Sequence, residues 1–235
     1  MSFPDFNASD AHIQWQRFCD LSWYHDDLGV WLDISRMHVN ATDLQQLQPR
    51  MDKAFAAMQE LEAGAIANPD EQRQVGHYWL RTPELAPSSE LQQHISREID
   101  LIAAFGRDVI NGTIKAPNGE AFTDVLWIGI GGSGLGPALM IKALQNPGEG
   151  LPFHFFDNVD PNGMSNVLAG LEGRLDRTLV VTVSKSGGTP EPHLGMEQAR
   201  HRLEAAGGQW AGQAVAVTML DSKLDQQAQK EGWLK

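Results

Sequence analysis

The chain has 235 residues, which is long enough to bury a sizeable core in one large domain or two smaller ones. Hydrophobic residues make up 42% of it and charged residues 20%, a composition typical of globular rather than disordered proteins. The formal charge of -12 argues against nucleic acid or an anionic membrane as a partner, because both are bound mainly through clustered lysine and arginine. An anionic ligand would therefore need a local positive site.

The amino-terminal sequence and the single cysteine predict a soluble, cytoplasmic protein. No basic residue followed by an apolar run marks a secretory signal, and no apolar stretch reaches the ~18 residues of a membrane span. One cysteine cannot form an internal disulfide, which fits a reducing compartment. Cys19 lies in a segment rich in tryptophan and phenylalanine, so we expect it to be a small buried residue.

Residues 1–112 are predicted to form a mainly helical segment that packs on the rest of the chain. Apolar residues recur at helical spacing over 10–24 and 44–61, and the pattern over 90–111 is that of an amphipathic helix. Glycine and proline end the second of these helices at 64–69. This half shows no alternation typical of strands.

From residue 113 onward, strand patterns alternate with helix patterns. Short apolar runs predict buried strands at 125–130, 152–156, 179–183 and 214–218. Helices are predicted at 133–144, 161–171, 191–206 and 221–230. Such alternation implies right-handed crossovers and a parallel sheet with helices on both faces. Residues 113–235 are therefore predicted to be a doubly wound, flavodoxin-like α/β domain.

The loop after the third predicted strand carries the strongest functional signal. It combines hydroxyls, glycines and one lysine in the order Ser184, Lys185, Ser186, Gly187, Gly188, Thr189. Glycines let backbone N–H groups approach a ligand closely, and the helix that begins at Pro190 favours negative charge at its start. We therefore predict a phosphate-binding loop. The plain alternative is an ordinary strand-to-helix loop with a serine cap.

A second glycine-rich loop follows the first predicted strand. Gly129, Gly131 and Gly134 have the spacing of a dinucleotide-binding fingerprint, and Asp157 ends the next strand at about the distance of a ribose-binding acid. A dinucleotide-binding domain is one interpretation of this pattern. The other is that the glycines let the backbone and Ser133 approach a different small polar ligand.

The two loops are expected to meet if the first and third strands are neighbours. Ligands of open α/β sheets bind outside the carboxyl ends of the strands, where the strand order reverses. Loops 129–137 and 184–189 would then face one pocket, in which one holds a phosphate and the other the sugar-like body attached to it. A dinucleotide would leave the second loop unexplained.

Both loops resemble the signature stretches of the first sugar-isomerase (SIS) domain in the glucose-6-phosphate isomerase family, and the pattern is similar to its cyanobacterial branch. They read Gly-Ile-Gly-Gly-Ser-Gly-Leu-Gly-Pro at 129–137 and Ser-Lys-Ser-Gly-Gly-Thr-Pro-Glu at 184–191. Supporting stretches are Asn-Pro-Asp-Glu at 68–71, Gly-His-Tyr-Trp-Leu-Arg at 76–81 and Phe-Asp-Asn-Val-Asp at 156–160. The resemblance runs over most of the chain.

The resemblance implies a small phosphosugar as ligand. The residues it assigns to the phosphate are Ser184, Lys185, Ser186 and Thr189, and those it assigns to the sugar are Gly132 and Ser133. The family commonly has threonine where this chain has Gly188, so one hydroxyl contact is lost. The reaction implied is the interconversion of glucose 6-phosphate and fructose 6-phosphate in glycolysis and gluconeogenesis. It requires no metal or cofactor, and full-length members are homodimers.

The resemblance also implies that the catalytic groups lie outside this chain. In the family a glutamate, a histidine, a lysine and an arginine act on the sugar, and all follow the first SIS domain, so we expect them beyond Lys235 together with the second SIS domain. Glu191 is the one substitute base to nominate, but a glutamate beside Pro190 is typical of a first helical turn. We therefore expect phosphosugar binding without isomerisation by this chain alone. A stand-alone phosphosugar-sensing module is the alternative.

Overall fold

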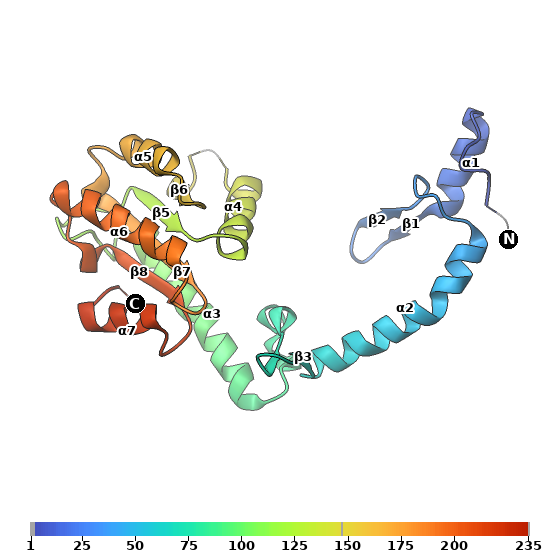
Figure 1. Cartoon of the computed structure of the whole chain (residues 1–235), viewed down its shortest axis with the longest axis horizontal. Helices are drawn as coiled ribbons and strands as arrows, with labels where there is room; N and C mark the ends of the chain where they lie inside the picture. The colour runs from blue at the N-terminus through green and yellow to red at the C-terminus, as the bar shows by residue number, and fades with distance from the viewer. Residues whose placement is uncertain (1–2, 147, 235) are drawn as a thin grey trace. The chain divides into compact units, whose positions relative to one another are not determined.

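The computed structural model describes residues 3–146 and 148–234, which form two compact units (Figure 1). The first unit ends at Arg97 and the second begins at Glu98, so the division falls inside helix α3 (Ser89–Ile110). Within these described ranges, no helix is both long and apolar enough to cross a membrane. The packing of residues 1–112 on the sheet domain stays a prediction from the sequence.

Within residues 3–97, the first unit contains two helices besides the first turns of α3, two short antiparallel hairpins and two 3-10 turns. The elements are α1 (Ala11–Leu21), β1 (Ser22–His25), β2 (Val30–Asp33), α2 (Ala41–Glu62), β3 (Ile66–Asn68), β4 (Arg73–Gln74), η1 (His77–Leu80) and η2 (Pro83–Leu85). The Asp10 side chain caps α1, and Asn40 forms a reciprocal capping box with Asp43 at the start of α2. Polar caps therefore set where both helices begin.

The two hairpins are strands that the sequence pattern of this half does not indicate. The helix predicted over 10–24 ends at Leu21, and Trp23 enters β1 instead. Aromatic and β-branched residues favour strands, and here they flank the turn at 26–29. Gly29 has a φ of 60°, the left-handed conformation that lets the chain reverse.

Arg17 is a charged residue buried within the first unit, with only 2% of its surface exposed. Its guanidinium donates hydrogen bonds of 2.8 to 2.9 Å to the carbonyl oxygens of Pro4, Ser35, Met37 and Val39. The side chain therefore ties α1 to the segments on either side of it. Cys19, expected to be buried, is exposed, because the buried face of α1 carries Arg17 and Leu21.

The second unit is the doubly wound α/β domain that the sequence predicts. Its elements after α3 are β5 (Asp124–Ile128), α4 (Gly132–Leu144), β6 (Phe153–Phe156), α5 (Pro161–Gly170), η3 (Leu175–Arg177), β7 (Thr178–Ser184), α6 (Pro190–Ala205), η4 (Trp210–Gly212), β8 (Ala214–Thr218) and α7 (Lys223–Glu231). The sheet is parallel in the order β6-β5-β7-β8. The first and third strands of this unit are therefore neighbours, which confirms the flavodoxin-like order.

Alternate residues of the sheet face two separate cores. On one face, Leu126 and Val180 pack in a buried cluster to which α5, α6 and α7 contribute. On the other face, Val125 and Val181 pack with the last turns of α3 through Val109. Figure 1 shows α5, α6 and α7 gathered around the strands. Burial on both faces explains why these strands are continuous apolar runs in the sequence.

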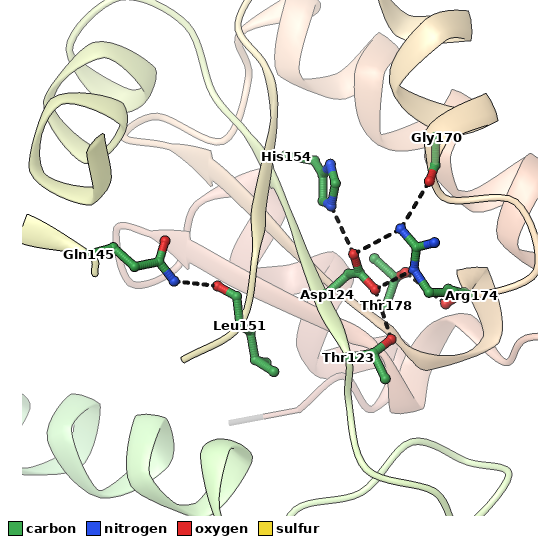
Figure 2. Close-up of polar contacts among 8 residues, drawn as sticks. All are labelled: Thr123, Asp124, Gln145, Leu151, His154, Gly170, Arg174 and Thr178. Atoms are coloured by element: carbon green, nitrogen blue, oxygen red, sulfur yellow. Dashed lines mark hydrogen bonds and ion pairs between the residues drawn. The ribbon is translucent and has the colours of Figure 1, made fainter. Parts of the chain in front are cut away.

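A charged network joins the starts of the strands (Figure 2). It lies at the end of the sheet opposite the two glycine-containing loops. Asp124, the first residue of β5, is 1% exposed. Its carboxylate accepts hydrogen bonds from Thr123 Oγ1 at 2.8 Å and Arg174 Nε at 2.9 Å, and lies 2.9 Å from His154 Nε2. Burial raises the pKa of Asp124, but the hydrogen bonds from Arg174, His154 and Thr123 outweigh it and hold that pKa below its ordinary value of 3.8.

Asp124→Asn is expected to lower the free energy of unfolding by roughly 2 kcal/mol at pH 7, because a buried carboxylate that accepts charge-assisted hydrogen bonds is lost. The folded-state pKa lies below the unfolded one, so the stabilisation is complete above pH 3.8 and disappears as the pH falls through the folded value. Urea unfolding at pH 7, 5 and 3 measures this, with the exposed Asp100→Asn as the control. An equal loss at pH 3 and pH 7 would contradict the argument.

Candidate functional site

The two predicted loops leave the same edge of the sheet. Strands β5 and β7 pair in parallel, with Ile128 opposite Thr182, so their carboxyl ends lie side by side. Loop 129–137 continues from β5 into α4, and loop 184–189 continues from β7 into α6. This is the crevice where open α/β sheets bind ligands.

Loop 184–189 is a turn rich in hydrogen-bond donors. The buried Ser184 hydroxyl donates to Thr189 Oγ1 at 3.1 Å, and the N–H of Gly188 donates to Ser186 Oγ at 3.3 Å. The N–H of Gly187 donates to the carbonyl of Ser184 at 3.1 Å. Thr189 is the N-cap of α6, yet its side chain makes no capping hydrogen bond to the helix. The side-chain cap of the plain alternative is thus absent from this described loop, because the N-cap residue of α6 offers the helix no side-chain acceptor.

The segment between β8 and α7 holds this loop in place. The Thr218 hydroxyl donates to the carbonyl oxygen of Ser184 at 2.6 Å. Gly187 has a φ of 66°, and a Cβ placed on it would lie 2.6 Å from the backbone nitrogen of Leu224. Only glycine combines this φ with such close contact to α7. The loop conformation is therefore set by packing that a ligand would find already formed.

The other loop is shaped by a close approach of helix and strand. The N–H of Gly129 donates to the carbonyl of Phe156 at 3.1 Å. A Cβ on Gly134 would lie 2.3 Å from the Gly129 carbonyl oxygen, so a side chain there is excluded. Trp127 Nε1 donates to the carbonyl of Ser133 at 2.8 Å. Close packing of the backbone thus explains why the first and last residues of the G-x-G-x-x-G pattern, Gly129 and Gly134, are glycines.

A cavity of about 330 Å³ opens beside the second loop. Its walls come from the loop through Ser184, Gly187, Gly188 and Thr189, and from the facing sides of α6 and α7. No residue of 129–137 lines this cavity. A pocket shared by the two loops therefore stays a prediction.

The predicted binding residues divide into those at the cavity and those away from it. Ser184 and Thr189 line it, whereas Lys185 and Ser186 are exposed and do not. Gly132 and Ser133 begin α4, where glycine is exposed and serine half-buried. Glu191, the nominated base, lies partly exposed in the first turn of α6 and does not line the cavity.

The cavity also contains residues that the loop motifs do not indicate. Thr182 comes from β7, His193 from the first turn of α6, and Lys223 from the start of α7. Thr182 precedes Ser184 by two residues, so the period of a strand places both on one face. That alternation is the signal that would have found Thr182. Lys223 is brought in by the tertiary fold alone.

Comparisons with known proteins agree on one family. The family model described as phosphoglucose isomerase matches residues 33–231. The glucose-6-phosphate isomerases of Synechococcus sp. (strain CC9605) and Prochlorococcus marinus (strain MIT 9211) are 99% and 52% identical over the whole chain, which spans 44% of each. The crystal structure of a glucose-6-phosphate isomerase from Chlamydia trachomatis matches with a TM-score of 0.75 at 29% identity, over 95% of this chain and 43% of that one. The chain therefore spans under half the length of these relatives.

Gly187→Ala is expected to lower the free energy of unfolding by about 1–3 kcal/mol, because alanine would be strained at positive φ and would press on α7. Gly188→Ala is the matched control, since its nearest contacts would be 3.9 and 4.0 Å away and its φ is not in the positive range. Chemical denaturation of both variants measures the difference. Equal stabilities would show that the Gly187 conformation is not required.

Proposed function

Because the chain belongs to the phosphoglucose isomerase family, we propose that it binds a phosphosugar and forms part of an isomerase that interconverts glucose 6-phosphate and fructose 6-phosphate. The family match over residues 33–231 is the observation that carries the proposal. We further propose that the full-length form is a cytoplasmic homodimer that serves glycolysis and gluconeogenesis, without nucleic acid or membrane as a partner.

The phosphate is assigned to loop 184–189. The hydroxyls of Ser184, Ser186 and Thr189 donate hydrogen bonds to its oxygens, and the Lys185 ammonium offsets its negative charge. The uncapped start of α6 adds backbone N–H groups and the positive end of the helix dipole. These donors suit a dianion, which accepts hydrogen bonds and donates none at neutral pH.

The sugar body is assigned to Gly132 and Ser133 at the start of α4. This loop leaves the strand next to β7, so a ligand held by its phosphate at loop 184–189 extends along the same sheet edge toward it. Gly132 has no side chain to obstruct a hydroxylated ring, and Ser133 supplies one hydroxyl.

Isomerisation needs more than these groups provide. Proton transfer between C2 and C1 requires a base, ring opening requires an acid, and the enediolate requires a cation. The two loops offer hydroxyls and one lysine, and Glu191 lies outside the cavity. We propose that the chain contributes phosphosugar binding, and that the acid and base come from the part of the full-length relatives that this chain does not span.

Fructose 6-phosphate at about 100 times its Kd is expected to raise the Tm of the chain by roughly 5–10 °C, because it binds the native state only. Lys185→Gln should reduce that shift to near zero at the same concentration, each Tm being compared with that of the same variant without ligand. Lys230→Gln, an exposed lysine of α7, is the control and should keep the full shift. A full shift in Lys185→Gln would remove loop 184–189 from the phosphate site.

A coupled assay of fructose 6-phosphate isomerisation is expected to show no turnover by this chain above the protein-free rate. The full-length relative from Synechococcus sp. (strain CC9605) serves as the positive control. Turnover near that of the full-length protein would contradict the proposed division of roles, and its loss in Glu191→Gln would then identify Glu191 as the base.

A further inference from the structure

Loop 184–189 is held by a threonine that the loop motif does not contain. Thr218 ends β8 and lies opposite Ser184 in the register of the sheet. Its half-buried hydroxyl donates to the Ser184 carbonyl oxygen at 2.6 Å and lies 3.5 Å from the carbonyl oxygen of Lys185. The N–H of Met219 donates to the same Lys185 carbonyl at 3.2 Å. Two successive carbonyl groups of the loop are therefore held toward β8.

The direction of these carbonyl groups fixes the direction of the N–H groups that follow them. A trans peptide points its C=O and its N–H to opposite sides. The peptide that joins Lys185 to Ser186 is trans, so with its carbonyl held on the β8 side the Ser186 N–H points the other way. Strand β7 has β5 on that other side, because the strand order is β6-β5-β7-β8. A backbone donor of the loop therefore points to the side where loop 129–137 begins.

The Thr218 hydroxyl is itself fixed by Ser222. The two hydroxyl oxygens lie 2.7 Å apart, and Thr218 has only one proton, which it gives to the Ser184 carbonyl. Ser222 is therefore the donor between them. The Ser222 oxygen also accepts the N–H of Asp225 at 3.1 Å, which caps the start of α7. A directed chain of hydrogen bonds thus runs from the α7 cap through Thr218 to the backbone of the loop.

We propose that Thr218 is a positioning residue for ligand binding at loop 184–189. It does not line the cavity, and it acts through the Ser184 carbonyl, which also accepts the Gly187 N–H at 3.1 Å. Without the Thr218 hydroxyl, the peptide after Ser184 can rotate, so a ligand must first order the donors that it binds. This inference rests on the function proposed above, because the ligand whose affinity Thr218 sets is the phosphosugar of that proposal.

The test is a calorimetric titration of fructose 6-phosphate into the full 235-residue chain. Thr218→Val removes the hydroxyl and should weaken the affinity about tenfold, through loss of one hydrogen bond. Thr218→Ser keeps the hydroxyl and should restore the affinity of the wild type. Thr178→Val is the matched control, because Thr178 donates to the Arg174 carbonyl at 2.9 Å at the other end of β7. It should lower the Tm at least as much as Thr218→Val and leave the affinity unchanged.

Hydrogen exchange of the Gly187 amide provides a readout that needs no ligand. This N–H donates to the Ser184 carbonyl that Thr218 holds. Its exchange should therefore become about tenfold faster in Thr218→Val and stay unchanged in Thr178→Val. An unchanged exchange rate in Thr218→Val would overturn the positioning role.

The outcomes separate this inference from the proposed function. If Thr218→Val binds fructose 6-phosphate as tightly as the wild type, or if Thr178→Val loses as much affinity, the positioning role is overturned and the proposed function stands. If the wild type does not bind this phosphosugar, or if Lys185→Gln leaves its affinity unchanged, the proposed function fails instead. Faster Gly187 exchange in Thr218→Val alone would then still show that Thr218 holds the loop.

Discussion

The parallel pairing of β5 with β7 is the constraint on which the rest of the second unit depends. Strand β6 lies between these two strands in the sequence, but the pairing brings the carboxyl ends of β5 and β7 to the same edge of the sheet. Both glycine-containing loops therefore begin at that edge. The same register places Asp124 opposite Thr178 at the other edge. The hydrogen-bond network around Asp124 thus lies at one end of the sheet, and the two loops proposed to bind the ligand lie at the other end.

The sheet unit was predictable because each of its local signals agrees with the fold. Apolar runs with turn residues between them define the strands, and the strand at 214–218 was predicted with the bounds that β8 has. The first unit was less predictable, because the apolar spacing around Trp23 indicated a helix although aromatic residues favour strands. The Asp124 network was not predictable at all, since His154 and Arg174 lie 30 and 50 residues further along the chain.

The sequence predicted which donor residues belong to the candidate site, but it did not predict how they are arranged. Loop motifs indicate hydroxyls and a lysine, yet they do not say which side of the loop each faces. The structure places Ser184 and Thr189 at the cavity and leaves Lys185 outside it. Lys223 also lines the cavity, although it belongs to the next crossover. It reaches the cavity because the start of α7 packs against Gly187. Contacts between separate crossovers carry no local sequence signal, so reading the loop alone misses them.

The hydroxyls of loop 184–189 already bond to one another. A serine hydroxyl has one proton to donate, and Ser184 gives it to Thr189 Oγ1. A phosphate bound as proposed would take this proton only by breaking that bond, so part of its binding free energy would offset the bond that is lost. Because Gly187 fixes the backbone against α7, the loop has little freedom to keep this bond by moving when a ligand binds.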